Sequence, residues 1–125
     1  MNSEIYREMI LDHYKNPTNA GVVPDASVIS KDYNPSCGDV IEIQIKVSDN
    51  VIEDIKFQGQ GCAISQSSTD ILIDLVKNKN VQEIKDFTSE EFVRNLGIEL
   101  SPLRLNCALL GLKTLKIAVY TYLGS

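Results

Sequence analysis

Residues 34–47 read NPSCGDVIEIQIKV, and this segment sets the expected architecture of the whole chain. From Ile41 to Val47 apolar and polar residues alternate, which predicts a β-strand with one dry face and one wet face. The preceding NPSCGD is expected to be a turn, because Asn-Pro favours a turn and Gly38 lets backbone groups approach closely. This turn places a thiol, Cys37, close to a carboxylate, Asp39, just before the strand.

The segments on either side extend this strand into a sheet. Residues 27–33 are expected to form a strand before the turn, and residues 48–50 (SDN) a hairpin turn after it. In the next strand we expect Val51, Ile55 and Phe57 to share one face. Three successive strands with alternating faces predict a three-stranded antiparallel sheet.

Helical periodicity covers most of the remaining chain. The expected helices are residues 3–15, 62–76, 81–86, 89–96 and 102–122. The second is expected to bury a stripe formed by Ile64, Ser68, Ile71, Leu72, Leu75 and Val76. The last, which Ser101 and Pro102 begin, is expected to bury Leu105, Ala108, Leu109, Leu112, Leu115 and Val119. The order of elements predicts an α+β domain spanning residues 1–125, with the helices packed on one face of the sheet.

Composition narrows the class of protein. The chain has 125 residues, 43% of them hydrophobic, and a net charge of -5 with mixed charges along its length. It has no long basic stripe, so we expect no nucleic-acid partner. It also has no apolar run near the roughly 20 residues that cross a bilayer, and no signal-peptide pattern at its start. We therefore expect a cytoplasmic protein without a membrane partner, in a compartment where disulfides are rare.

Each of the three cysteines has neighbours that suit a thiolate. Cys37 precedes a glycine, and Cys62 follows a Gly-x-Gly loop at an expected helix N-terminus, where the helix dipole favours an anion. Cys107 lies one helical turn after Arg104, whose guanidinium can support a nearby anion. Gly111, one turn later, is expected to leave open space beside the Cys107 sulfur. Together with Asp39, these sulfurs form a reasonable set for a tetrahedral ion or an iron–sulfur cluster.

Spacing alone leaves a plainer interpretation open. The chain contains no C-x-x-C pair, which structural zinc sites and ferredoxin clusters commonly use. Free cysteines often act as small buried hydrophobic residues, and an aspartate in a turn is usually a turn former. His13, the single histidine, is expected to be an ordinary surface or half-buried side chain. The tyrosines are expected to serve packing or an interface.

The three cysteine segments nevertheless carry a specific resemblance. NPSCGD at residues 34–39, QGQGCAIS at residues 58–65 and RLNCALL at residues 104–110 resemble the iron–sulfur cluster assembly scaffold family, of the IscU and NifU N-terminal type. The segment LDHYKNP at residues 11–17 also resembles that family's first helix and loop. The similarity covers nearly the whole chain.

The resemblance implies a scaffold or carrier rather than an enzyme. By motif, Cys37, Cys62 and Cys107 match the family's three cluster cysteines, and Asp39 matches the acidic residue beside the first. Such a scaffold accepts sulfur from a cysteine desulfurase, binds iron and builds a transient [2Fe-2S] cluster. It then passes the cluster to recipient apo-proteins or carrier proteins, and zinc can occupy the same site. The resemblance also makes Cys107 the candidate persulfide acceptor, with Arg104 as anion support, in a monomer or a homodimer.

Two departures point toward the SufU branch of this family. Many members have His before the third cysteine, where this chain has Asn106, so Asp39 becomes the better fourth ligand. Many members also carry a Leu-Pro-Pro-Val-Lys segment that a chaperone reads, whereas residues 100–104 read LSPLR. However, residues 78–100 are too short for the insertion typical of SufU. A zinc-dependent sulfur acceptor therefore remains the alternative function, and a purely structural zinc domain a third hypothesis.

Overall fold

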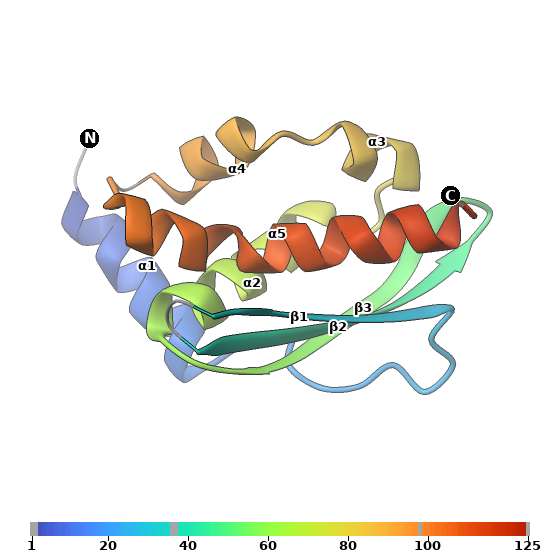
Figure 1. The fold of residues 1–125 in the computed structure, drawn as a ribbon, viewed down its shortest axis with the longest axis horizontal. Coiled ribbons are helices and arrows are strands. Elements are labelled where there is room, and N and C mark those ends of the chain that lie inside the picture. Colours follow the sequence, from blue (N-terminus) through green and yellow to red (C-terminus); the bar gives the residue numbers. More distant parts are fainter. Residues whose placement is uncertain (1–2, 36–37, 98, 125) are drawn as a thin grey trace.

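The computed structural model describes residues 3–35, 38–97 and 99–124 (Figure 1). The elements in chain order are α1 (Ser3–Lys15), β1 (Val28–Asn34), β2 (Asp39–Ser48), β3 (Val51–Gln60), α2 (Ala63–Val76), α3 (Val81–Asp86), α4 (Ser89–Leu96) and α5 (Pro102–Tyr122). The strands form one antiparallel sheet in the order β1-β2-β3. Figure 1 shows α2 and α5 on the same side of this sheet, with α3 and α4 beyond them. The predicted α+β architecture is confirmed.

The hairpin turn between β2 and β3 has the form that its sequence favours. Ser48 pairs with Val51, so the loop contains two residues, Asp49 and Asn50. Both have positive φ values, 53° and 63°. Asp and Asn adopt this left-handed region more readily than most residues, and two-residue turns of this kind match the twist of the strands they join.

The prediction that Val51 shares a face of β3 with Ile55 and Phe57 is wrong. Ile52 is fully buried, whereas Val51 is only partly buried. The cause is a shift in register: Lys46 pairs with Asp54, but the next residue of β2, Val47, pairs with Ile52. The extra residue in β3 turns the side chains that precede it to the opposite face, as a β-bulge does.

The face of β2 that was expected to be exposed to solvent is also only partly exposed. Gln44 is 7% exposed, and its Oε1 accepts a hydrogen bond from the backbone N–H of Val23 at 2.8 Å. The segment between α1 and β1 therefore covers this part of the sheet. A glutamine can be buried here because its amide is hydrogen-bonded.

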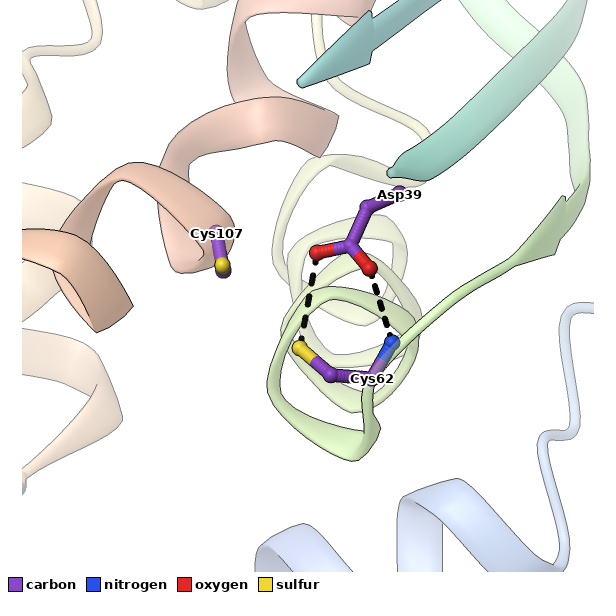
Figure 2. Close-up of side chains that lie close together, drawn as sticks. All are labelled: Asp39, Cys62 and Cys107. Atoms are coloured by element: carbon purple, nitrogen blue, oxygen red, sulfur yellow. Dashed lines mark hydrogen bonds between the residues drawn. The ribbon is translucent and has the colours of Figure 1, made fainter. Parts of the chain in front are cut away.

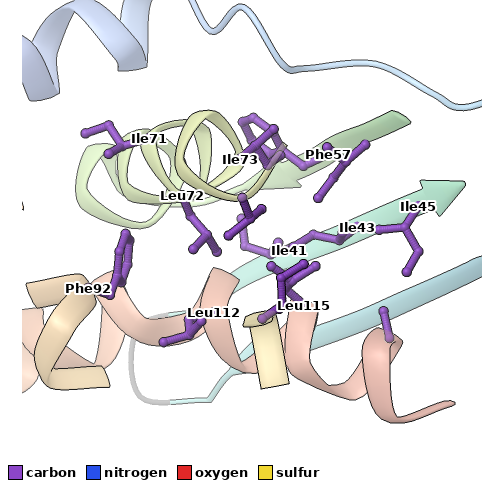
Figure 3. Close-up of a cluster of buried hydrophobic side chains, with 14 of the residues drawn as sticks. Ile41, Ile43, Ile45, Phe57, Ile71, Leu72, Ile73, Phe92, Leu112 and Leu115 are labelled. Atoms are coloured by element: carbon purple, nitrogen blue, oxygen red, sulfur yellow. The ribbon is translucent and has the colours of Figure 1, made fainter. Parts of the chain in front are cut away.

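The core lies between the sheet and the two long helices (Figure 3). It includes Ile41, Ile43, Ile45, Phe57, Leu72, Ile73, Phe92, Leu112 and Leu115. The predicted stripes of α2 and α5 contribute to this core, but α2 is buried more widely than its stripe. Ser65, Ser67, Thr69 and Asp70 are also buried, because α2 packs against α1, α5 and β3.

The space beside Gly111 is occupied rather than open, which corrects the prediction for this glycine. A Cβ atom on Gly111 would lie 3.0 Å from Cβ of Thr69 and closer still to its hydroxyl. Gly111 therefore lets α5 approach α2 closely.

Helix α5 begins as predicted, with the Ser101 hydroxyl accepting a hydrogen bond from the Arg104 backbone N–H and Pro102 in the first turn.

An ion pair joins α5 to the edge strand β1. Nζ of Lys113 lies 3.0 Å from Oδ2 of Asp32. Burial acts to raise the pKa of Asp32, but the ammonium group of Lys113 and the hydrogen bond from the backbone N–H of Tyr33 outweigh it. The pKa of Asp32 is therefore lowered from its ordinary value of 3.8.

Among the helices of the described ranges, none is long and apolar enough to cross a membrane.

Candidate metal centre

The turn between β1 and β2 brings Asp39 to one end of the sheet. Asn34 pairs with Asp39, and the Asn34 carbonyl accepts a hydrogen bond from the Gly38 backbone N–H at 2.8 Å. Gly38 has a φ of 74°, which a residue without a Cβ adopts at little cost. The predicted ligand Cys37 lies outside the described residues, so its role remains a prediction.

Asp39 contacts Cys62 through both carboxylate oxygens (Figure 2). Its Oδ1 accepts the backbone N–H of Cys62 at 2.8 Å, and its Oδ2 lies 3.4 Å from the Cys62 sulfur. Cys62 occupies the N-cap position of α2, as the Gly-x-Gly signal indicated. Asp39 is 1% exposed, whereas Cys62 is exposed. The carboxylate therefore forms the floor of the site and Cys62 lies at its mouth.

Gly61 makes this contact between Asp39 and Cys62 possible. Its φ is 140°, and a Cβ atom there would overlap the Asp39 carboxylate. A residue with a side chain would therefore push either Asp39 or the α2 N-terminus away. Gly59 has a related role, because a Cβ atom there would lie 2.6 Å from the Val40 carbonyl oxygen.

Cys107 completes the set from the second turn of α5. Cys107 is 3% exposed, and its sulfur faces the same space as Asp39 and Cys62 in Figure 2. One ligand atom from each of these three residues lies within 4.8 Å of the other two. Two sulfurs and a carboxylate oxygen at this separation fit a zinc ion or an iron of a sulfide cluster after small adjustments. The predicted convergence holds for the three described donors.

Arg104 differs from Asp39 and Cys107 in its exposure to solvent. It is exposed, whereas Cys107 is buried, and its backbone N–H donates a hydrogen bond to the Ser101 hydroxyl. Anion support by its guanidinium remains a prediction. Asn106 is also exposed, at the rim of a groove that Tyr33, Lys113 and Tyr120 help to line.

A second cluster of possible ligands joins α1 to α2. Nδ1 of His13 is paired with Oδ2 of Asp70, whose other oxygen accepts the Asn19 backbone N–H at 2.9 Å. The Asn19 side-chain amide donates to Oδ1 of Asp74 at 2.9 Å. His13, Asp70 and Asp74 are near enough to hold a metal, but hydrogen-bond donors already occupy these carboxylates. We interpret the cluster as a structural connection, in which the half-buried His13 pairs with a fully buried carboxylate.

Sequence reasoning missed two polar groups beside the sulfurs. Nδ2 of Asn34 lies 3.9 Å from the Cys107 sulfur, and the buried Oγ of Ser65 lies 3.9 Å from the Cys62 sulfur. The sequence indicates Asn34 only as part of the Asn-Pro turn. Ser65 could have been found from its position three residues after the helix N-cap Cys62, because that spacing brings a side chain back to the cap.

The fold and these donors define a class of protein, namely small α+β domains with Cys and Asp side chains close enough to hold a metal ion at one end of a three-stranded sheet. The NifU-like N terminal domain family matches residues 5–125, and the chain belongs to that family.

Individual relatives agree with this assignment. The iron–sulfur cluster assembly scaffold protein IscU of Aquifex aeolicus is 38% identical over 120 residues, covering 94% of this chain and 76% of that protein. The zinc-dependent sulfurtransferase SufU of Bacillus subtilis is 33% identical over 132 residues, covering 92% of this chain and 89% of that protein.

One solved structure is similar to this chain over nearly the full length of both chains. It is a putative iron–sulfur cluster assembly scaffold protein for the SUF system from Fervidobacterium islandicum. It superposes with a TM-score of 0.79 at 30% identity, covering 95% of this chain and 99% of that chain.

Proposed function

We propose that this protein is an iron–sulfur cluster assembly scaffold. In this proposal it accepts sulfur from a cysteine desulfurase, binds iron and builds a transient [2Fe-2S] cluster for recipient apo-proteins or carrier proteins in the cytoplasm. The convergence of Asp39, Cys62 and Cys107 within 4.8 Å carries the proposal. Cys37, two residues before Asp39 in the sequence, is the proposed further ligand. The scaffold works as a monomer or a homodimer.

The site has features that suit a cluster which is later released. Asp39 offers a hard oxygen ligand, which binds iron in a sulfide cluster more weakly than a thiolate does. Cys62 lies exposed at the mouth, so one side of the site faces solvent. A weak ligand and an open side both favour transfer over permanent storage.

Cys107 is the proposed persulfide acceptor. Its thiolate attacks the outer sulfur of the desulfurase persulfide, the S–S bond breaks, and the desulfurase cysteine leaves as a thiolate. This exchange needs no oxidant or reductant. Converting the transferred sulfur to sulfide takes two electrons, which an external electron-donor protein supplies. Because Cys107 is 3% exposed, the persulfide reaches it only when the mouth of the site opens. Arg104, one turn earlier on the exposed surface, would attract the anionic sulfur.

Anaerobic reconstitution with iron, sulfide and a cysteine desulfurase tests the scaffold proposal. We expect visible absorbance from a cluster, lost in Cys62→Ala and in Cys107→Ala and retained in Asp86→Ala, a carboxylate control at the end of α3. A protein that stays colourless excludes the scaffold function. In Asp39→Ala we expect a longer-lived cluster, whereas no cluster at all would make Asp39 an essential ligand.

Mass spectrometry after a single turnover with the desulfurase locates the persulfide. The proposal expects 32 additional mass units, about the mass of one sulfur atom, on the peptide that contains Cys107. The same mass on the peptide that contains Cys62 would instead assign acceptance to the exposed cysteine.

A zinc-dependent sulfur acceptor is the second candidate function. Two thiols, a carboxylate and the neighbouring Cys37 suit tetrahedral zinc, and the similarity to a relative named as a zinc-dependent sulfurtransferase favours it. Bound zinc would lower the pKa of its cysteine ligands and hold them as thiolates. Zinc found in protein purified without added iron, together with faster desulfurase turnover, would favour this function over the scaffold.

A purely structural zinc site makes a different prediction. Such a site contributes most of the folding free energy, so removing the metal would unfold the chain. The buried apolar cluster between the sheet, α2 and α5 is extensive without any metal. We therefore expect the metal-free protein to keep its secondary structure, as circular dichroism after chelation would show.

A further inference from the structure

Asn34 connects two of the segments that form the metal centre. Its backbone carbonyl accepts from Gly38 and closes the turn that leads to Asp39. Its side-chain Nδ2 lies 3.9 Å from the sulfur of Cys107 on α5. One residue at the end of β1 therefore contacts both the hairpin and the helix that supply ligands.

The two described sulfurs have unlike surroundings. The Cys62 sulfur is exposed and lies 3.4 Å from a carboxylate oxygen, Oδ2 of Asp39. The Cys107 sulfur is buried and has an amide N–H donor beside it. A thiolate that water cannot reach depends on protein donors for stabilisation, because low local dielectric strengthens each such bond.

We propose that Asn34 is a positioning residue for the metal centre: its side-chain N–H bonds to the Cys107 sulfur and reduces the electron donation of that sulfur to a bound metal. The proposal rests on the proposed function, since it requires a metal bound at this site. Hydrogen bonds to ligand sulfurs are among the features that set the properties of thiolate metal sites. Asn34 thus makes Cys107 and Cys62 electronically unequal ligands.

Cobalt(II) is the probe for this inference, because a cysteine thiolate bound to it gives a sulfur-to-metal charge-transfer band. Without the N–H donor the sulfur lone pairs lie higher in energy, so the band should move to longer wavelength. We expect this in Asn34→Ala and in Asn34→Leu, which is close in size but carries no hydrogen-bond donor and no metal ligand. We also expect about 10-fold weaker Co²⁺ affinity in both, because the side chain no longer holds the Cys107 sulfur in position for the metal. Both variants keep the backbone carbonyl that closes the turn.

The matched control is Asn106→Ala. Asn106 also carries an amide and adjoins Cys107 in sequence, but its side chain is exposed. Its band position and Co²⁺ affinity should equal those of the wild-type protein. Circular dichroism on every variant separates an effect on the sulfur from loss of the fold.

The outcomes separate the two proposals. A wild-type protein that binds Co²⁺ without a thiolate band overturns the metal centre itself. A normal wild-type band that stays unmoved in both Asn34 variants, with unchanged affinity, overturns the role of Asn34 and leaves the proposed function intact. If both variants fail to fold, the test passes to wild-type protein loaded with cadmium-113. There the Asn34 side-chain N–H should show scalar coupling to the metal through the sulfur, and its absence overturns the inference.

Discussion

The carboxylate of Asp39 fills the space where a side chain on Gly61 would stand: a Cβ atom there would lie 2.6 Å from Cγ of Asp39. The same carboxylate accepts the backbone N–H of Cys62, the next residue along the chain. The conformation of this glycine and the position of a proposed ligand are therefore coupled.

Replacing Gly61 by alanine should impair metal binding. The new methyl group displaces Asp39, so we expect at least about 10-fold weaker Zn²⁺ or Co²⁺ affinity, measured by competition with a chromophoric chelator. Gly38→Ala is the control, because Gly38 also has a positive φ but has open space around it. That variant should lose about 1 kcal/mol of stability and keep its metal affinity. Equal loss of affinity in both variants would show that backbone strain, not overlap with Asp39, is responsible.

Gly111→Ala should destabilise the fold through α2. Its methyl group would overlap Thr69, and forced overpacking typically costs about 1–3 kcal/mol in the free energy of unfolding. Thr69→Ala in the same chain removes the hydroxyl and methyl groups that the new Cβ meets, so part of the loss should be recovered. Urea unfolding of both single variants and the double variant measures this coupling. Strictly additive effects would contradict the contact.

His13→Ala should weaken the connection between α1 and α2. It leaves the fully buried Asp70 with one fewer donor, which costs about 1–3 kcal/mol in the free energy of unfolding. Lys15→Ala is the control, since Lys15 is an exposed residue at the end of the same helix. Amide hydrogen exchange should show faster exchange in α1 in the first variant only. Unchanged protection there would mean that apolar packing alone holds the helix.

The pair formed by Asp32 and Lys113 should make stability depend on pH. The pKa of Asp32 is lowered in the folded state, so its contribution is fully present above its ordinary value of 3.8 and disappears as pH falls through the lower folded value. The difference in unfolding free energy between the wild-type protein and Asp32→Asn should therefore shrink below about pH 4. Chemical unfolding from pH 7 to pH 2.5 measures it, and a difference that grows on acidification would reverse the assignment.

Much of the fold follows from local signals in the sequence. The bounds of α1, α3, α4 and α5 agree with the predicted ranges, because caps and breakers such as Asn16-Pro17, Thr88, Gly97 and Ser101-Pro102 act within a few residues. The alternation in residues 41–47 likewise located β2. These features require no knowledge of what the element packs against.

The errors arose where contacts distant in sequence determine the outcome. The face of Ile52 depends on the register between β2 and β3, and the burial of Gln44 depends on the segment that contains Val23. The space beside Gly111 depends on Thr69, which belongs to another helix. For the site, the sequence predicted Asp39, Cys62 and Cys107 as donors, but the approach of Asn34 to Cys107 appears only when β1 and α5 are packed together.

The donors Asp39, Cys62 and Cys107 belong to a hairpin, a helix N-terminus and the final helix, which meet only after the chain has folded. A chain that has been synthesised only as far as α2 contains Asp39 and Cys62, whereas Cys107 joins them only after α5 has left the ribosome. The described donor set is therefore complete only when α5 has packed against α2 and the sheet.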